Sequence, residues 1–180
     1  MINKQLNDSV ILLRPLVPSD AEEVFEAVRE SITELVRWMP WCHEDYALEE
    51  SRNWINACMK SRAEGTAYEF GIFSAQDGSF LGGGGLNHIR AIDKTANLGY
   101  WVRPSRTKQG VGTRSARLLA DYGFKELGFN RIEIIPCVEN LASRRVAQKV
   151  GARLEGTMRN RLLLQGTPHD AMLFSLIPGE

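Results

Sequence analysis

The sequence predicts an α+β protein in which a mixed sheet is flanked by helices. Segments typical of strands and segments typical of helices alternate along all 180 residues. Strand patterns follow one another first, and a strand–helix–strand unit comes later, which is the order of an α+β fold. No repeat or low-complexity linker divides the sequence, and its length suits one domain with a sizeable core. We therefore expect residues 1–180 to form a single domain.

The first expected elements are a short strand and two helices. Residues 10–14 read Val-Ile-Leu-Leu-Arg, and this largely aliphatic run predicts a strand. Pro18-Ser19-Asp20 is typical of a helix start, because a side-chain oxygen there can accept hydrogen bonds from the unpaired amides of the first turn. Apolar residues at helical spacing predict the helix that follows it and a second helix over residues 48–62.

A hairpin is expected next. Residues 68–73 and 80–82 have the pattern of strands, and the Asp-Gly pair within residues 76–79 favours a tight turn between them. Four consecutive glycines over residues 82–85 lie in a strand pattern. We interpret them as a bulged or bent strand rather than a phosphate-binding loop.

The second half of the chain predicts alternating strands and helices. The expected elements are, in order, a strand over 96–102, a helix over 111–127, a strand over 131–135, a helix over 141–150 and a strand over 171–177. Pro104 stops the first of these strands, because it has no amide to donate to a neighbouring strand. Gly151 suits the left-handed position that ends a helix.

The composition is that of a globular protein. Hydrophobic residues make up 43% of the chain and charged residues 24%. No apolar run approaches the ~18 residues of a membrane helix, and the first residues lack the apolar segment of a secretion signal. Three cysteines without paired spacing predict neither a disulfide framework nor a cysteine-based zinc site. We expect a reducing, cytoplasmic location and no membrane partner.

The net charge is zero, but its distribution is uneven. Residues 1–69 contain 7 basic and 13 acidic side chains, whereas residues 70–180 contain 15 basic and 9 acidic ones. This asymmetry suits an acidic face for a cationic partner and a basic face for an anionic one. The alternative interpretation is that solvated charges are segregated by chance. The sequence pI of about 6.8 lies below the strongly basic values typical of nucleic-acid-binding domains. We expect no direct nucleic-acid partner.

The sharpest local motif lies between the strand that contains Trp101 and the long helix. Residues 105–113 read Ser-Arg-Thr-Lys-Gln-Gly-Val-Gly-Thr. Glycines let backbone amides approach a ligand, and the helix N-terminus adds the positive end of its dipole, so the segment suits an anion. An ordinary glycine-containing helix start fits the same residues. The spacing matches neither the Walker loop nor the dinucleotide fingerprint.

A second motif opens the short helix. Asn140 and Ser143 are three residues apart at its expected start, so their side chains lie on one face of the helix. Asn140 also suits the N-cap position, and a capping role is compatible with a functional one.

Together these motifs resemble those of the GCN5-related N-acetyltransferases (GNAT). The matching order is Gln-Gly-Val-Gly-Thr at 109–113, a helix, a strand, Asn-x-x-Ser at 140–143, a helix and Gly151. Residues 38–41 (Trp-Met-Pro-Trp), 86–89 (Leu-Asn-His-Ile) and 94–101 resemble the branch that acetylates N-terminal amines of ribosomal proteins. The resemblance covers nearly the whole chain. It implies the GNAT fold, with a central mixed, mostly antiparallel sheet flanked by helices.

The resemblance also implies acetyl-CoA as the co-substrate and direct acetyl transfer to an amine. Backbone amides at the helix start would hold the pyrophosphate, and the backbone around Trp101 and Val102 would polarise the thioester carbonyl. Ser143 would assist departure of the thiolate, and Asn140 would orient the thioester, the pantetheine arm or a water. The implied cofactor-binding residues are Trp101, Val102, Lys108, Gln109, Gly110, Val111, Gly112, Thr113 and Asn140.

The phosphate loop departs from the family pattern at two positions. Thr107 stands where the family has Gln or Arg, and Lys108 stands where a glycine is common. Because backbone amides hold the pyrophosphate, we expect the class of ligand to be unchanged and the detailed geometry of the loop to differ.

The candidate general base is Glu69, on an expected central strand, where a solvated strand residue is the alternative interpretation. An α-amine with a pKa near ~7.8 is partly neutral at pH 7.4 and needs only a weak base. In the family branch, a base follows the turn that corresponds to Glu155-Gly156. Residues 159–162 contain no carboxylate, so we do not assign that role here.

The acceptor is left open. The first interpretation is the N-terminal α-amine of a protein or peptide, with a ribosomal protein as the acceptor that the resemblance implies. A small amine (polyamine, amino acid or antibiotic) and a non-catalytic acyl-CoA sensor are the alternatives.

The three histidines lack ligand spacing, so no metal is expected. Cys137 is expected to be packed rather than nucleophilic, and a homodimer is left open.

Overall fold

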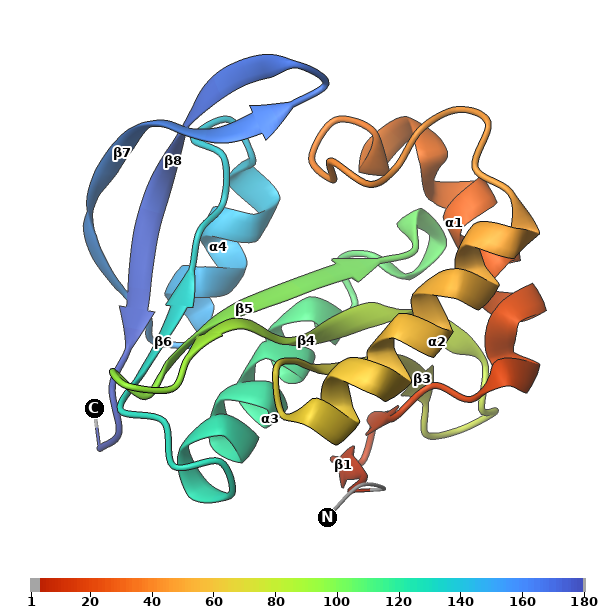
Figure 1. Cartoon of the computed structure of the whole chain (residues 1–180), viewed down its shortest axis with the longest axis horizontal. Coiled ribbons are helices and arrows are strands. Elements are labelled where there is room, and N and C mark those ends of the chain that lie inside the picture. Colours follow the sequence, from red (N-terminus) through yellow and green to blue (C-terminus); the bar gives the residue numbers. More distant parts are fainter. Residues whose placement is uncertain (1–3, 180) are drawn as a thin grey trace.

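The computed structural model describes residues 4–179 and shows an eight-stranded mixed sheet (Figure 1). The strand order is β1-β2-β3-β4-β5-β6-β8-β7, and the β5–β6 pair is parallel while the other neighbours are antiparallel. The strands are β1 (Leu6–Asn7), β2 (Ile11–Arg14), β3 (Tyr68–Ser74), β4 (Phe80–Arg90), β5 (Thr95–Val102), β6 (Arg131–Ile134), β7 (Arg153–Leu164) and β8 (Thr167–Leu176). The α+β class and the mostly antiparallel mixed sheet are confirmed.

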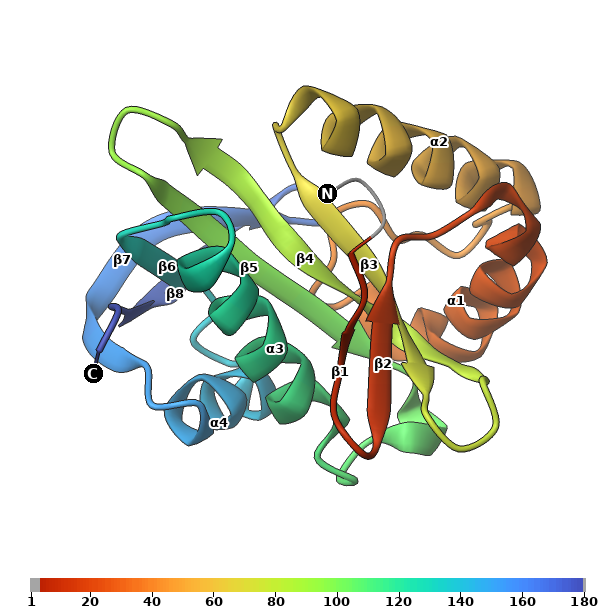
Figure 2. The same ribbon diagram turned by 90° about the horizontal axis from the view of Figure 1, so that it is seen from below.

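Helices cover both faces of the sheet (Figure 2). The helices are α1 (Ala21–Leu35), α2 (Leu48–Glu64), α3 (Val111–Lys125) and α4 (Leu141–Lys149). One core lies between the sheet and α3, with Phe70, Leu119 and Ile132 fully buried. A second core lies between the sheet and α1 and α2, where Phe73 and Ile55 are buried. Among residues 4–179, no helix is long and apolar enough to cross a bilayer.

The glycine run in β4 belongs to a bulged strand, as expected. Ile72 pairs with Gly82 but Phe73 pairs with Phe80, which leaves Leu81 as the extra residue. This insertion lets Leu81 and Leu86, five residues apart, enter the same core, which the alternation of a regular strand would prevent. On the other side of β4, a Cβ at Gly82 would lie 2.1 Å from the carbonyl oxygen of Trp101 on β5, so only glycine fits there.

Several predicted boundaries were wrong. β4 continues to Arg90 instead of ending at Gly82, β8 starts at Thr167 instead of residue 171, and the predicted helix 111–127 ends at Lys125. β1 and β7 were not predicted. β7 is mostly exposed along its length and so lacks a hydrophobic pattern. The Glu155-Gly156 pair, expected to form a turn, lies within β7 at a register shift.

The start of the first helix also differs from the prediction. Pro18–Asp20 forms a 3₁₀ turn, and α1 begins at Ala21. The Asp20 carboxylate accepts hydrogen bonds from the Val17 amide and the Arg14 guanidinium, each at 2.8 Å, and it does not cap the first-turn amides of α1. By contrast, Gly151 follows the end of α4 with a φ of 90°, as expected.

Candidate active site

The segment that leads into α3 presents a turn of backbone amides. After a 3₁₀ turn at Pro104–Arg106, Gly110 is the N-cap of α3 with a φ of 81°. The amides of the first helical turn, at residues 111–113, have no intrahelical acceptor. Lys108, Gln109 and Gly110 are exposed. The predicted phosphate-binding residues therefore have the geometry of an anion-binding helix start.

Lys108 has an unusual backbone conformation. Its φ is 61°, in the left-handed region that costs a non-glycine residue roughly 1–2 kcal/mol. A glycine at this position would adopt the same conformation without that cost. The departure from the family pattern at Lys108 therefore adds a basic side chain to the loop while the backbone keeps a glycine-like shape.

β5 and β6 pair only where both begin. Their parallel pairing covers Thr95↔Arg131 to Asn97↔Glu133. In the described part of the chain, β5 then continues to Val102 beside β4, while β6 ends at Ile134 and the chain turns toward α4 (Figure 1). Pro136 lies just beyond this point, and its carbonyl oxygen accepts a hydrogen bond from the Met172 amide at 2.9 Å. Beyond Asn97 and Glu133 the two strands therefore separate.

Ser143 and Asn140 meet at the start of α4. The Asn140 Oδ1 atom accepts the Ser143 amide at 3.0 Å, so Asn140 is the N-cap, as expected. The Tyr100 hydroxyl lies 2.9 Å from the Ser143 hydroxyl, and it donates to the Ser143 carbonyl oxygen at 3.1 Å. Burial raises the pKa of Tyr100 to about 12, so this phenol is neutral near pH 7.

Glu69 lies on β3 and faces a pocket. The Asn87 side-chain amide donates to Glu69 Oε1 at 2.9 Å, and Asn97 donates to Asn87 Oδ1 at the same distance. Burial raises the pKa of the Glu69 carboxyl above its ordinary value. Gly85 is required beside it, because a Cβ there would lie 2.1 Å from Glu69 Oε2. The structure thus gives Glu69 the environment of a tuned carboxyl rather than that of a solvated strand residue.

The pocket beside Glu69 combines aromatic walls with two carboxylates. Its volume is about 380 Å³. The lining residues are Val24, Val28, Met39, Trp41, Tyr46, Glu50, Trp54, Glu69, Gly83, Gly84, Asn87, Gly99, Tyr100 and Trp101. The pKa of Glu50 is lowered mainly by a hydrogen bond from the Ala47 amide and further by one from His43. The Glu50 carboxylate is therefore anionic. Aromatic faces and carboxylates together attract cations such as a protonated amine.

Tyr100 connects the two groups that the sequence singled out. Glu69 and Trp101 line the pocket, whereas Ser143 and Asn140 lie at the start of α4. Tyr100 lines the pocket and also contacts Ser143. Sequence reasoning missed the roles of Tyr100 and Asn87. Tyr100 follows buried Leu98 by two residues along β5 and so lies on the same face of the strand. This period of two is the signal that could have placed it toward α3 and α4.

Comparisons with known proteins agree with this geometry. Residues 11–153 match the model of the acetyltransferase (GNAT) domain. The chain belongs to the GNAT family and is an acetyl-CoA-dependent N-acetyltransferase.

The similar proteins include ribosomal-protein acetyltransferases. YdaF of Bacillus subtilis, provisionally a ribosomal N-acetyltransferase, is 30% identical over 171 residues, or 94% of this chain and 92% of that protein. The ribosomal-protein-serine acetyltransferase of Escherichia coli is 25% identical over 166 residues, or 92% and 91% of the two chains. A solved structure of RimL, a ribosomal L7/L12 α-N-protein acetyltransferase in complex with coenzyme A, has a TM-score of 0.90. It is 25% identical and covers 97% of this chain and 98% of that chain.

Proposed function

We propose that the protein acetylates the N-terminal α-amine of a protein or peptide, with a ribosomal protein in the cytoplasm as its acceptor. The main support is the position of Glu69. Its carboxyl has a raised pKa and lines an aromatic pocket that also contains anionic Glu50. An α-amine needs only a weak base, whereas a lysine amine, with a pKa near ~10.4, is almost fully protonated at neutral pH. The ribosomal acceptors of the similar proteins support the finer assignment.

The residues at the start of α3 fit the coenzyme. Gly110 has an open backbone, since a Cβ built there has only Arg114 Nε nearby, at 3.9 Å. The amides of residues 111–113 would hold the pyrophosphate, and Lys108 would add a positive charge. The separated end of β5, with Trp101 and Val102, would receive the pantetheine arm through its backbone. The bound coenzyme supplies the acetyl group as a thioester.

The chain's own groups would then move the protons. Glu69 accepts a proton from the amine as the C–N bond forms, because its raised pKa makes it a better base than an ordinary glutamate. The Ser143 hydroxyl donates a hydrogen bond to the sulfur as the C–S bond breaks, and the Tyr100 hydroxyl then donates to the Ser143 hydroxyl oxygen instead of to the Ser143 carbonyl. Tyr100 and the Asn140 cap hold Ser143 in place. A serine hydroxyl is a poor acid, so its contribution is this hydrogen bond rather than a complete proton transfer.

An acceptor panel tests the proposal. The protein is incubated with acetyl-CoA and peptides with free N-termini, matched peptides with blocked N-termini, polyamines, amino acids and aminoglycosides, and thiol release is followed. We expect turnover with the free N-termini, above all with ribosomal-protein N-termini, and none with the blocked peptides. Turnover confined to small amines would overturn the α-amine assignment. Turnover of a blocked peptide through its lysine would overturn it as well.

A further inference from the structure

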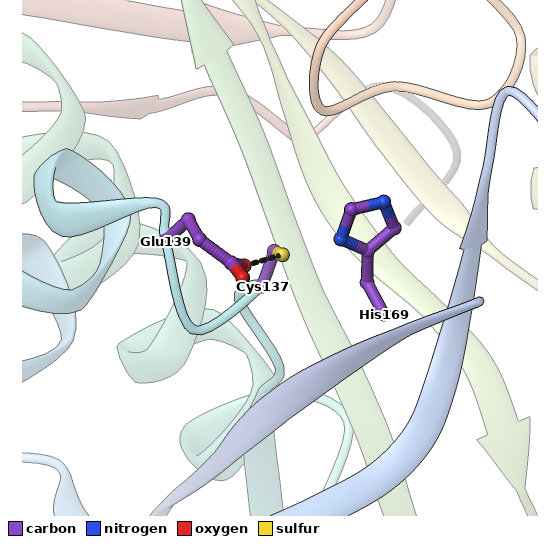
Figure 3. A group of neighbouring side chains, drawn as sticks. All are labelled: Cys137, Glu139 and His169. Carbon is purple, nitrogen blue, oxygen red and sulfur yellow. Dashed lines mark hydrogen bonds between the residues drawn. The ribbon is translucent and has the colours of Figure 1, made fainter. Parts of the chain in front are cut away.

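A second group of reactive side chains lies outside the proposed acetyl-transfer machinery. Cys137, Glu139 and His169 each offer one potential ligand atom, and these atoms all lie within 4.8 Å of one another. Figure 3 shows Cys137 and Glu139 on the segment between β6 and α4, with the His169 ring of β8 turned toward them. His169 lies 30 positions after Glu139 in the sequence, so the spacing of potential ligands along the chain does not reveal the group.

The backbone fixes the two segments against each other. Cys137 forms an isolated antiparallel bridge with Ala171, and the Val138 amide donates to the Asp170 carbonyl oxygen at 3.0 Å. The three side chains therefore come from a paired backbone and not from independent loops. Such preorganisation lowers the entropy cost of gathering ligands around an ion.

The group is closed on one side and open on the other. The Cys137 side chain is buried, with 2% of the residue exposed, whereas His169 is half-buried and Glu139 is exposed. The Cys137 thiol donates a hydrogen bond to Glu139 Oε2 at 2.6 Å. A bound cation would replace the proton of this contact and remain accessible to one solvent ligand.

We propose that Cys137, Glu139 and His169 bind one zinc-class divalent cation. Sulfur, imidazole nitrogen and carboxylate oxygen together suit Zn²⁺ and exclude the harder Mg²⁺ and Ca²⁺. Tetrahedral Zn²⁺ places its ligand atoms about 3.3–3.7 Å apart, from bond lengths of about 2.0–2.3 Å. The cluster therefore needs shifts of only about 1 Å. On binding, the Cys137 thiol releases its proton to solvent as the S–Zn bond forms, and the other two groups supply lone pairs.

The ion would join the segment before α4 to β8. Glu139 directly precedes Asn140, whose side chain caps α4 at Ser143. A cation held by Glu139, Cys137 and His169 would restrain this cap against the β7–β8 hairpin. We therefore expect the metal to stabilise the fold, because it binds the folded chain and the unfolded chain lacks the site.

Calorimetric titration of the reduced, chelator-treated protein with Zn²⁺ alone tests the site. We expect one Zn²⁺ per chain, a rise in Tm with Zn²⁺, and no comparable heat with Mg²⁺. Cys137→Ala and His169→Asn should each weaken Zn²⁺ binding by more than about 100-fold. Loss of a residue that only hydrogen-bonds to a metal ligand weakens binding by at most about 100-fold, so a larger loss indicates a direct ligand. Cys58→Ala and His43→Ala are the matched controls, because they remove a thiol and an imidazole elsewhere, and they should retain the wild-type affinity.

A second measurement keeps the test independent of folding of the variants. X-ray absorption of the zinc-loaded wild-type protein should show one sulfur ligand at about 2.3 Å and nitrogen or oxygen ligands at about 2.0–2.2 Å. A zinc site without sulfur would overturn the proposal. So would the absence of stoichiometric binding, or equal affinity in the wild type, Cys137→Ala and His169→Asn. None of these measurements uses acetyl-CoA, so they do not depend on the proposed acceptor.

Discussion

Tyr100 changes what the Ser143 hydroxyl can do. An isolated serine samples several rotamers, whereas the contact at 2.9 Å with a neutral phenol favours one. The Asn140 cap fixes the backbone of the same residue. Tyr100 is thus a positioning residue that acts through Ser143, and it comes from β5 rather than from the motif that contains the serine.

This arrangement predicts a non-additive pair of variants. Tyr100→Phe should lower kcat about tenfold, the equivalent of one hydrogen bond of about 1.4 kcal/mol. Ser143→Ala should lower kcat more than it lowers affinity for acetyl-CoA. Steady-state kinetics of the double variant should match Ser143→Ala alone, because the phenol then has no hydroxyl to position. Additive losses would show that Tyr100 acts elsewhere.

Glu69 predicts a specific pH dependence. Because burial raises its pKa, the carboxyl takes up a proton at a higher pH than an ordinary glutamate, whose pKa is near ~4.3. Base catalysis is therefore present above the raised pKa and is lost as the pH falls through it. Glu69→Gln should lower kcat/KM about 100-fold at neutral pH, the low end for general bases, because an α-amine is already partly neutral.

The measurement is the ratio of wild-type to Glu69→Gln rates across pH, which cancels titration of the substrate amine. This ratio should decline toward acid pH. Glu64→Gln is the control, because Glu64 is an exposed carboxylate at the end of α2, and it should leave the pH profile unchanged. A ratio that stays constant with pH would remove Glu69 as the base.

At the level of elements, two glycine variants distinguish the effect of backbone strain on stability from the effect of the α3 start on ligand binding. Gly110 and Gly128 both have positive φ, 81° and 68°, and neither has a close neighbour that a Cβ would strike. Gly110→Val and Gly128→Val should therefore each cost roughly 1–2 kcal/mol of stability. Only Gly110→Val should weaken acetyl-CoA binding, by about tenfold or more, because only Gly110 lies in the proposed cradle. Calorimetry with acetyl-CoA and thermal unfolding measure the two effects, and equal loss of affinity in both variants would contradict the cradle.

Elements with a strong hydrophobic periodicity or a clear capping residue were predictable from the sequence. Elements that form only because a neighbouring strand pairs with them were not. The helix from Val111 and the Asn140 cap follow from local signals that the structure reproduces. β7 has no such signal, because it is an edge strand with few buried residues, and its pairing with β8 defines it. The Tyr100–Ser143 contact and the Cys137–His169 proximity likewise depend on strand register, which hydrophobic patterns alone do not reveal.

At the scale of the whole molecule, the last hairpin reaches the loop that helps to line the acceptor pocket. Gln165, in the β7–β8 turn, donates from Nε2 to the Val36 carbonyl oxygen at 3.2 Å and to the Cys42 carbonyl oxygen at 3.3 Å. Met39 and Trp41, which line the pocket, lie between these two acceptors in the chain. Figure 1 shows the hairpin turn and the α1–α2 connection facing each other across the separated strands. The β7–β8 turn is therefore hydrogen-bonded to both sides of the segment that carries Met39 and Trp41.

Gln165→Ala should consequently affect the acceptor and not the coenzyme. Loss of two hydrogen bonds, each of about 0.5–1.5 kcal/mol net, should raise KM for a peptide acceptor several-fold to about 100-fold while kcat and the affinity for acetyl-CoA stay near wild type. Gln76→Ala removes an equally exposed side chain from the β3–β4 turn, away from the pocket lining, and should change neither constant. Initial rates over a matrix of peptide and acetyl-CoA concentrations separate the two KM values. The Gln165 contacts hold the α1–α2 loop, which lines the acceptor pocket, so their loss should not change the KM for acetyl-CoA. A rise in the KM for acetyl-CoA alone would contradict this prediction and would show that the hairpin acts on the coenzyme site.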